Sequence, residues 1–530
     1  MGSSYNEEKP EDAATTTTTC STGMTNDNNN DEDEGPVVHP TKELHIAPML
    51  HVSTFEFRNF MRILTRKATL WTEMVVDETL VFSGQSRDQL APHLHKNDVE
   101  NPIVCQIGGI DADYSAQATQ LVESYGYNEI NLNMDCPSER VSGRNFGAIL
   151  MRPEQVDQAM DILQCMQDNA PSHLPVSLKC RIGIDEFDSM EFLEELITKL
   201  SKACQRFVLH ARRVLLKGLS PKENRIVPPL NYPRVYQICH RFPDCEFWIN
   251  GGIPGLRRAK QIMYGIDTTS DVTIHDNQHQ VPCSICDNPN GSCTAPPDPV
   301  PPNLRGVMLG RAAMDHPAQF ADVDRYLYGC QENPCQTRRQ VLDQYIAFLE
   351  RTYPRRCCDS DERPTSRLSP SPNIVHERPH CRLCRELATI ENPSDAYDDD
   401  IMDDDNGTGT DYENGNVNGG NNESNIIDSK AIQKKQRRQR PGVKIYQGVV
   451  DRALKPVANI FFGLKGSKGF RRACDRNCRD LTMRNCGPAF ILRKALQVMP
   501  PEALDQSFIP TEKLKDADVP VHVSPLSCPG

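Results

Sequence analysis

Eight short apolar runs recur between residues 44 and 310, and helix-like stretches separate most of them. The runs are LHIAPM (44–49), LWTEMVV (70–76), IVCQIGG (103–109), EINLN (129–133), VSLKCR (176–181), RFVLH (206–210), EFWIN (246–250) and GVMLG (306–310). Helical patterns lie at 113–125, 153–168, 188–203, 255–264 and about 315–328. Short, fully apolar runs separated by helices are typical of a parallel sheet that is buried on both faces. Eight such units over roughly 290 residues predict an α/β fold, a (β/α)8 TIM barrel, with an open doubly wound sheet as the alternative.

The rest of the chain predicts a small all-helical domain after the barrel. TRRQVLDQYIAFLERTY (336–352) is amphipathic, and helical patterns resume at 443–478 and 488–498. Acidic, Asn-rich and Pro-rich segments predict disorder. The expected organisation is a disordered acidic tail (1–40), a barrel (41–330) with a surface insertion (267–303), a helical tRNA-binding domain (331–354 and 443–500), a disordered acidic then basic insertion (355–442) and a C-terminal tail (501–530).

The net charge of −13 hides an uneven distribution. Residues 1–36 carry −8 and residues 386–430 carry −12, so the remaining residues carry +7. Residues 434–479 hold fourteen Lys or Arg and two acids, a net of +12. Such a basic segment favours contact with a phosphate backbone. The alternatives are a nuclear-localisation run at 434–440 and an ordinary solvated helix for the remainder.

Several classes of protein are excluded by the composition. No run approaches 18 consecutive apolar residues, so no transmembrane helix and no membrane partner is expected. The N-terminus lacks the basic and apolar regions of a signal peptide. The 21 cysteines are too dilute for a disulfide scaffold and fit a reducing compartment. We expect a cytoplasmic monomer, with an organelle as the alternative location.

Polar residues gather where the predicted strands end, which is where barrel enzymes place their active sites. The residues at these strand ends form a ring of mixed but mostly polar character: Pro48 and Met49, Glu73, Gln106, Asn133, Lys179 and Arg181, His210, Asn250-Gly251-Gly252 and Gly310-Arg311. This ring lacks the clustered carboxylates of a glycosidase or a divalent-metal site. Glycines after the last two strands let backbone N–H groups approach a phosphate. A phosphorylated cofactor is therefore expected there, with Lys179 and His210 facing its ring system.

Cys136 follows the fourth predicted strand directly, in NLNMDCPSERV (131–141). A cysteine on a loop at the catalytic face is a candidate acid, base or nucleophile. The alternative is a buried structural cysteine, which is the commoner role in a chain with so many thiols. Its position at a strand end is what favours the functional interpretation.

Several segments together resemble the tRNA-dihydrouridine synthases, most closely the bacterial synthase A type. They are IAPML (46–50), TEM (72–74), GYNEINLNMDCPSERV (126–141), KCRIGID (179–185), HARRVLLKGLSPKENR (210–225), IVPPLNYPRVYQ (226–237), INGGI (249–253) and GVMLGR (306–311). The similarity covers about 43–330 without the insertion, and GVVDRALKPVANIFFGLKGSKGFRR (448–472) resembles the C-terminal helical domain of that type.

The resemblance implies an FMN-dependent enzyme that reduces uridine to 5,6-dihydrouridine in the D-loop of tRNA, with NADPH as electron donor. It makes Cys136 the catalytic proton donor. The implied FMN contacts are Pro48, Met49, Leu50, Gln106, Lys179, His210, Asn250, Gly251, Gly252, Gly310 and Arg311. The implied tRNA contacts are Asn133, Lys222, Arg225, Lys468, Arg471 and Arg472. Two alternatives are an FMN-dependent TIM-barrel oxidoreductase acting on a small pyrimidine-like substrate and an RNA-binding module with an inactive barrel.

The chain departs from the family pattern at two places. The residue before the catalytic cysteine is usually Gly and here is Asp135, whose carboxylate would favour the protonated thiol if it pointed that way. The first loop continues as His51-Val52-Ser53-Thr54 in place of the family's acidic and Thr-Asp pattern. No metal is predicted, although Cys283, Cys286 and Cys293 with His275 and His279, and Cys381 and Cys384 with His376 and His380, have ligand types suited to zinc.

Overall fold

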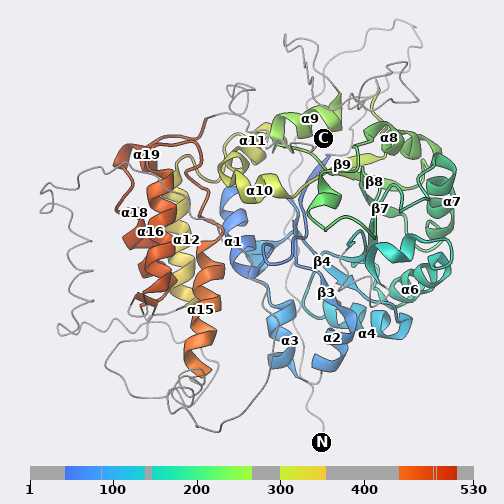
Figure 1. Ribbon diagram of the computed structural model, residues 1–530, viewed down its shortest axis with the longest axis horizontal. Helices are drawn as coiled ribbons and strands as arrows, with labels where there is room; N and C mark the ends of the chain where they lie inside the picture. Colours follow the sequence, from blue (N-terminus) through green and yellow to red (C-terminus); the bar gives the residue numbers. More distant parts are fainter. Residues whose placement is uncertain are drawn as a thin grey trace, which may run out of the picture. The chain divides into compact units, whose positions relative to one another are not determined.

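Eight parallel strands form a closed barrel in the computed structural model (Figure 1). The strands are β1 (Glu43–Ile46), β2 (Leu70–Trp71), β4 (Ile103–Gly108), β5 (Glu129–Met134), β6 (Val176–Arg181), β7 (Arg206–His210), β8 (Glu246–Asn250) and β9 (Leu304–Leu309). They pair in the order β1-β9-β8-β7-β6-β5-β4-β2. Thr69, just before β2, closes the ring on β1: its N–H donates to the Leu44 carbonyl (2.9 Å) and its carbonyl accepts from the Ile46 N–H (2.8 Å). The predicted TIM barrel is thereby confirmed over the open sheet.

The structure describes residues 42–84, 86–137, 146–265, 299–353, 441–480, 483–484 and 486–509. The predicted tail 1–40, most of the insertion 267–303, nearly all of 355–442 and most of 501–530 lie outside these ranges. Among the described helices, none has the length and apolar character needed to span a lipid bilayer.

The run predicted at 70–76 divides into β2 and β3 (Val75–Val76), both paired with β4. The Thr72 side chain explains the break. Its hydroxyl oxygen accepts a hydrogen bond from the Gln106 N–H (3.1 Å), whereas in a regular sheet this N–H would donate to a backbone carbonyl. The Thr72 O–H donates to the Glu73 carbonyl (2.8 Å). The chain therefore bends after Thr72 before it rejoins β4.

Helices surround the barrel, and those predicted from the sequence lie within a few residues of their expected places. The barrel helices are α1 (Phe55–Leu64), α2 (Asp77–Ser83), α3 (Arg87–Leu94), α4 (Ala112–Glu123), α6 (Val156–Asn169), α7 (Met190–Leu200), α8 (Tyr232–Arg241) and α9 (Leu256–Tyr264). The helix predicted at about 315–328 is instead three short pieces, α10 (Arg311–Asp315), η4 (Pro317–Asp322) and α11 (Val323–Tyr326). Pro317 has no N–H to continue a helix, which accounts for the first break.

A second group of helices packs beside α1 (Figure 1). It contains α12 (Arg338–Thr352), α15 (Pro441–Leu454), α16 (Ser467–Arg479), α18 (Pro488–Leu496) and α19 (Pro501–Asp505), called here the helical region. The pattern predicted as continuous over 443–478 ends at Leu454 and resumes at Ser467. Gly463 and Gly466 between them have φ angles of 80° and 91°, a left-handed conformation that favours glycine.

The side chains of the strands alternate between the barrel interior and the helices outside, as a pleated strand requires. One interior layer is apolar: Ala47, Trp71, Val104, Val208, Trp248 and Met308. Two residues further along three of these strands, the inward positions become Gln106, His210 and Asn250, all buried. The same two-residue alternation places Asn133 on β5, and Lys179 and Arg181 on β6, at inward positions. The fold thus delivers polar side chains to the carboxyl ends of the strands.

Candidate active site at the carboxyl ends of the strands

Four ionisable side chains from three neighbouring strands meet at the barrel mouth. Asp135, one residue beyond β5, receives hydrogen bonds from Lys179 Nζ and from Arg181 Nε (2.6 Å), both on β6. Its Oδ1 also lies 3.3 Å from His210 Nδ1 at the end of β7. Lys179 and Arg181 are nearly inaccessible to solvent, whereas the Asp135 carboxylate is 17% exposed. This Asp135 cluster is the most strongly charged part of the predicted site.

The cluster fixes the protonation of two of its members. Burial disfavours the Asp135 carboxylate, but the charges of Lys179 and Arg181 outweigh burial and hold its pKa well below the usual range. Burial, reinforced by the Arg181 charge, lowers the pKa of His210 to about 3, so its imidazole is neutral near pH 7. Asp135 therefore points toward Lys179 and Arg181, whose charges compensate its own. The sequence predicted an effect of this carboxylate on the adjacent thiol only if it pointed toward the thiol as an isolated charge.

A chain of amides holds the loop that carries Cys136. Asn133 Nδ2 donates to Gln106 Oε1 (3.0 Å), and Gln106 Nε2 donates to Asn131 Oδ1 (2.9 Å). The Asn133 side-chain oxygen accepts from the backbone N–H of Cys136 (3.2 Å). Asn133, predicted to contact tRNA, is buried and positions the cysteine loop in this structure. Cys136 is half-buried directly after the strand end, as predicted.

The two glycines after β8 allow the backbone to approach the site closely. Gly251 and Gly252 have φ angles of 109° and 64°. A Cβ atom at Gly251 would lie 2.6 Å from the His210 ring, and one at Gly252 would lie 2.3 Å from the Leu230 side chain. A larger residue at either position would displace these side chains. Asn250, beside them, is buried and donates to the Met308 carbonyl (2.9 Å).

The loop after β1 carries the predicted contacts Pro48, Met49 and Leu50. Ser53 organises this loop: its hydroxyl donates to the Ala47 carbonyl (2.9 Å) and accepts from the Met49 N–H (3.1 Å). Met49 packs against the apolar interior layer, while Leu50 is 64% exposed. The unexpected sequence His51-Val52-Ser53-Thr54 thus still forms an ordered loop, and Thr54 caps α1.

Arg181 also connects the Asp135 cluster to the loop that follows β7. Arg181 Nη1 donates to the Asn224 carbonyl (2.9 Å). The Asn224 side chain is fully buried: its oxygen accepts from the Leu215 N–H and its Nδ2 donates to the Leu215 carbonyl (2.8 Å each). Lys222 and Arg225 flank Asn224 and are exposed. Arg311 Nη2 lies 3.4 Å from the Arg225 carbonyl, so these two arginines lie close together. Gly310 precedes Arg311 at the end of β9.

The three basic residues predicted to bind tRNA from the helical region lie on α16. Lys468 and Arg472 are exposed, and Arg471 is half-buried with Nη1 3.5 Å from Asn459 Oδ1. None of the three appears in the Asp135 cluster. The basic run 434–440 and both Cys/His clusters lie outside the described residues.

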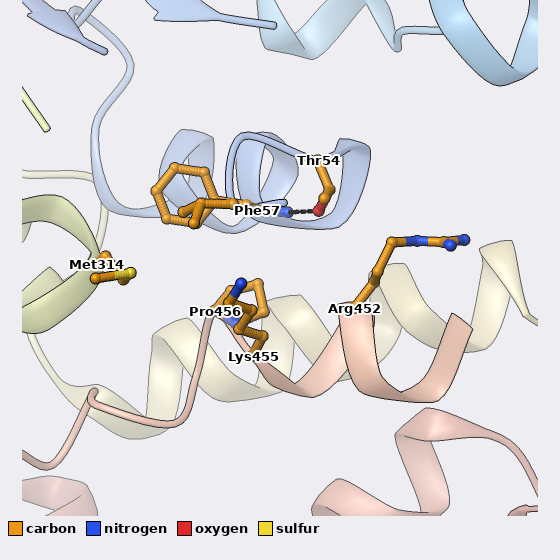
Figure 2. Close-up of a pocket in the computed structure, with 7 residues that line it drawn as sticks. Thr54, Phe57, Met314, Arg452, Lys455 and Pro456 are labelled. Carbon is orange, nitrogen blue, oxygen red and sulfur yellow. Dashed lines mark hydrogen bonds between the residues drawn. The ribbon is translucent and has the colours of Figure 1, made fainter. Parts of the chain in front are cut away.

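A small pocket lies where α1 and the loop before it meet α10 and the end of α15 (Figure 2). Its lining residues are Val52, Thr54, Phe57, Met314, Arg452, Lys455 and Pro456. Two basic residues that line the pocket also contact α1 and the loop before it. Arg452 Nε lies 3.3 Å from Glu56 Oε1, and Lys455 Nζ donates to the His51 carbonyl (2.5 Å). The pocket does not contain the strand-end residues, so we place the chemistry at the barrel mouth and not here.

Sequence reasoning missed two residues of this site. Arg181 belonged to the strand-end ring but received no role, and Asp135 stood out only as a departure from a pattern. The period-2 spacing of Lys179 and Arg181 could have indicated that both side chains point inward. Nothing in the sequence indicated the direction of Asp135, which lies beyond the strand.

Comparison with known proteins identifies the family of this chain. Residues 45–283 match the dihydrouridine synthase family. A tRNA-dihydrouridine(20/20a) synthase of Escherichia coli O6:H1 is 36% identical over 60% of this chain and 82% of its own length. The protein of the same name from Vibrio cholerae is 34% identical over 58% of this chain and 80% of its own. Among solved structures, a 2-naphthoyl-CoA reductase complex aligns over 39% of this chain and 44% of its own, with 9% identity and a TM-score of 0.30, too low to support an argument. On the relatives' similarity and coverage, the chain belongs to the dihydrouridine synthase family.

Proposed function

We propose that this protein reduces uridine to 5,6-dihydrouridine in the D-loop of tRNA, with FMN as cofactor, NADPH as electron donor and Cys136 as proton donor. The observation that carries the proposal is the position of Cys136 at the end of β5, beside a ring of inward polar residues at the barrel mouth. The names of the relatives, tRNA-dihydrouridine(20/20a) synthases, support tRNA as the substrate.

The residues at the mouth suit a flavin mononucleotide. An isoalloxazine ring presents several acceptor atoms and one N–H, and Gln106 and Lys179 offer an amide and a cation from adjacent parts of the ring. Glycine at 251 and 252 lets the backbone lie directly against His210 and Leu230, where a Cβ atom would clash. Arg311 supplies an exposed cation next to Gly310 for the phosphate. Pro48, Met49 and Leu50, after β1, would contact the ring's apolar edge, and His210 and Asn250 would contact it from the ends of β7 and β8.

When bound, the flavin would supply a hydride to C6 of the uracil ring, and the protein must then protonate C5. A thiol with an ordinary pKa near 8.5 is mostly protonated at pH 7 and can act as this acid. Asn133 would serve that step by holding the Cys136 backbone in place. The uridine has to leave its stack to reach the site, as in other enzymes that act on bases.

The exposed basic residues offer contacts for the tRNA backbone. Lys222 and Arg225 lie next to the mouth, and Lys468, Arg471 and Arg472 lie on α16 of the helical region. Asn133 was predicted to touch the substrate nucleotide, and its burial favours an indirect role through Cys136 instead. Phosphate contacts of this kind give salt-dependent affinity without sequence selectivity.

The test is to incubate the purified protein, FMN and NADPH with tRNA that lacks dihydrouridine, and to locate the product by mass spectrometry of tRNA fragments. We expect dihydrouridine in D-loop fragments and no NADPH oxidation with free uracil or orotate. Reduction of the free pyrimidines but not of tRNA would instead identify a small-molecule oxidoreductase. A protein that binds tRNA but no flavin would be an RNA-binding module.

A further inference from the structure

We propose that Asp135 is a positioning residue that sets the charge of the flavin pocket: its carboxylate offsets the two buried cations of β6 and thereby lowers the reduction potential of the bound flavin. This inference rests on the proposed function, because it concerns the flavin that the function requires. It goes beyond that function in giving a role to a residue that neither donates the proton nor supplies the hydride.

The first argument is that both oxygens of Asp135 are used. Oδ2 accepts from Lys179, and Oδ1 accepts from Arg181 Nε (2.6 Å) and lies 3.3 Å from His210 Nδ1. Lys179 and His210 are the same side chains that are expected to face the flavin ring. Asp135 therefore contacts two of the side chains that are expected to contact the cofactor.

The second argument concerns net charge. Lys179 and Arg181 are 4% and 2% exposed, so without Asp135 the pocket would hold two buried and unopposed cations. Buried charges that lack a partner are strongly disfavoured. With Asp135 ionised and His210 neutral, the cluster carries a single positive charge instead of two.

The third argument excludes the obvious alternative, that Asp135 itself protonates the substrate. Its carboxylate accepts hydrogen bonds from two permanent cations, and their charges hold its pKa well below the usual range for aspartate. A group in this state has no proton to donate near pH 7. The proton donor remains Cys136, and Asp135 acts through the charge that it places beside the ring.

The consequence for the cofactor follows from elementary electrostatics. Two-electron reduction leaves additional negative charge on the flavin ring, so nearby cations raise its potential and a nearby carboxylate lowers it. A lower potential makes the reduced ring a stronger hydride donor, which suits the reduction of a pyrimidine. Charge close to the ring nitrogens is one of the levers by which a protein tunes a flavin.

The experiment compares the holoenzyme with Asp135→Asn, which removes the charge at constant size, and with Asp135→Gly, which removes the side chain. Asp188→Asn is the matched control, because Asp188 is also held by two arginines, Arg234 (2.5 Å) and Arg213 (3.4 Å), but among the described residues no hydrogen bond or ion pair joins it to the Asp135 cluster. The bound FMN is titrated spectroelectrochemically, and the dissociation constant for oxidised FMN is measured by fluorescence quenching at several salt concentrations.

Both Asp135 variants should favour reduced over oxidised flavin by at least about tenfold relative to the wild type, which is about 30 mV more positive for a two-electron couple. They should also bind oxidised FMN more tightly at low salt, since a negative charge near an anionic cofactor has been removed. Asp188→Asn should change neither quantity.

Several outcomes would overturn the inference. An unchanged potential in Asp135→Asn would show that the carboxylate does not act on the ring. Opposite shifts in the two variants would mean that volume and not charge matters. If both variants are unfolded, or bind no FMN, Asp135 is a structural element or a cofactor ligand. If the wild type itself binds no flavin, the proposed function fails before this inference is reached.

Discussion

The two ends of the barrel each contain an ion cluster, but the two clusters differ in their balance of charge. At the amino ends of the strands, Arg206 lies between Glu129 (2.9 Å) and Glu246 (2.5 Å), and Arg305 also contacts Glu246 (2.8 Å). The Arg206 guanidinium stacks 4.8 Å from the centre of the Trp248 ring. At the carboxyl ends, one carboxylate, Asp135, serves two permanent cations and a histidine.

The difference indicates what each cluster is for. At the amino ends, two carboxylates meet two arginines and each ion pair joins opposite charges, so these groups contribute to stability. At the carboxyl ends the two cations, Lys179 and Arg181, outnumber the single carboxylate of Asp135. A cluster with excess positive charge, at the face where barrels bind substrates, would favour an anionic ligand.

The largest expected effect tests whether the carboxyl end is the catalytic one. Cys136→Ala should bind FMN and be reduced by NADPH as the wild type is, because the thiol is not among the implied flavin contacts. Dihydrouridine formation should fall by about 10²–10⁴-fold, the usual worth of a positioned acid. Single-turnover assays with pre-reduced enzyme measure this step.

Cys165→Ala is the control for this variant, because Cys165 is also half-buried but lies on α6 outside the barrel. It should retain full activity. Loss of flavin binding in Cys136→Ala would contradict the prediction and make Cys136 a structural residue.

The next pair of variants contrasts the two clusters directly. Arg206→Met leaves Glu129 and Glu246 without their shared cation and should lower the free energy of unfolding by about 3 kcal/mol, while the folded fraction still binds FMN. Lys179→Met leaves the Asp135–Arg181 pair intact, so it should cost little stability but yield a colourless protein that regains activity with excess FMN. Urea titration and flavin absorbance measure the two responses. If both variants lowered FMN retention equally, the clusters at the two ends of the barrel would not differ in function.

A smaller effect concerns the helical region. Replacing Lys468, Arg471 and Arg472 by Ala should weaken tRNA binding and make the log–log salt dependence shallower by roughly 2–3 units, since each phosphate contact contributes about 0.7–0.9. FMN content should not change. A charge-matched control is Lys199, Lys202 and Arg241→Ala, on and just after α7 and at the end of α8. If the Lys468, Arg471 and Arg472 variant keeps the salt dependence of tRNA binding seen in the wild type, Lys222 and Arg225 become the next candidates for tRNA contact.

The sequence predicted the barrel and the strand-end ring because both depend on local periodicity. Parallel strands place their carboxyl ends together, and period-2 spacing decides which side chains point inward, as it does for Lys179 on β6. Other features depend on contacts between distant segments. The break after Thr72 needs a hydroxyl–backbone bond to β4, and the direction of Asp135 depends on cations that follow it by more than forty residues.

The last expected effect is a pH dependence that isolates His210 in the carboxyl-end cluster. Burial first, and then the Arg181 charge, lower its pKa to about 3 in the folded protein, against about 6.5 for an unfolded chain. Between these values the unfolded state binds more protons than the folded state, so folding stability should fall as pH decreases from about 6.5 toward 3. Asp135, whose folded pKa is also depressed, adds to this loss only below about 4, where unfolded aspartate becomes protonated. His210→Gln keeps a polar side chain but cannot titrate. Its unfolding midpoint in urea should therefore decline less steeply than that of the wild type between pH 6.5 and 4, while the two curves run parallel above pH 7. Parallel curves throughout would mean that His210 is protonated in the folded state and that the cluster carries one positive charge more than its geometry indicates.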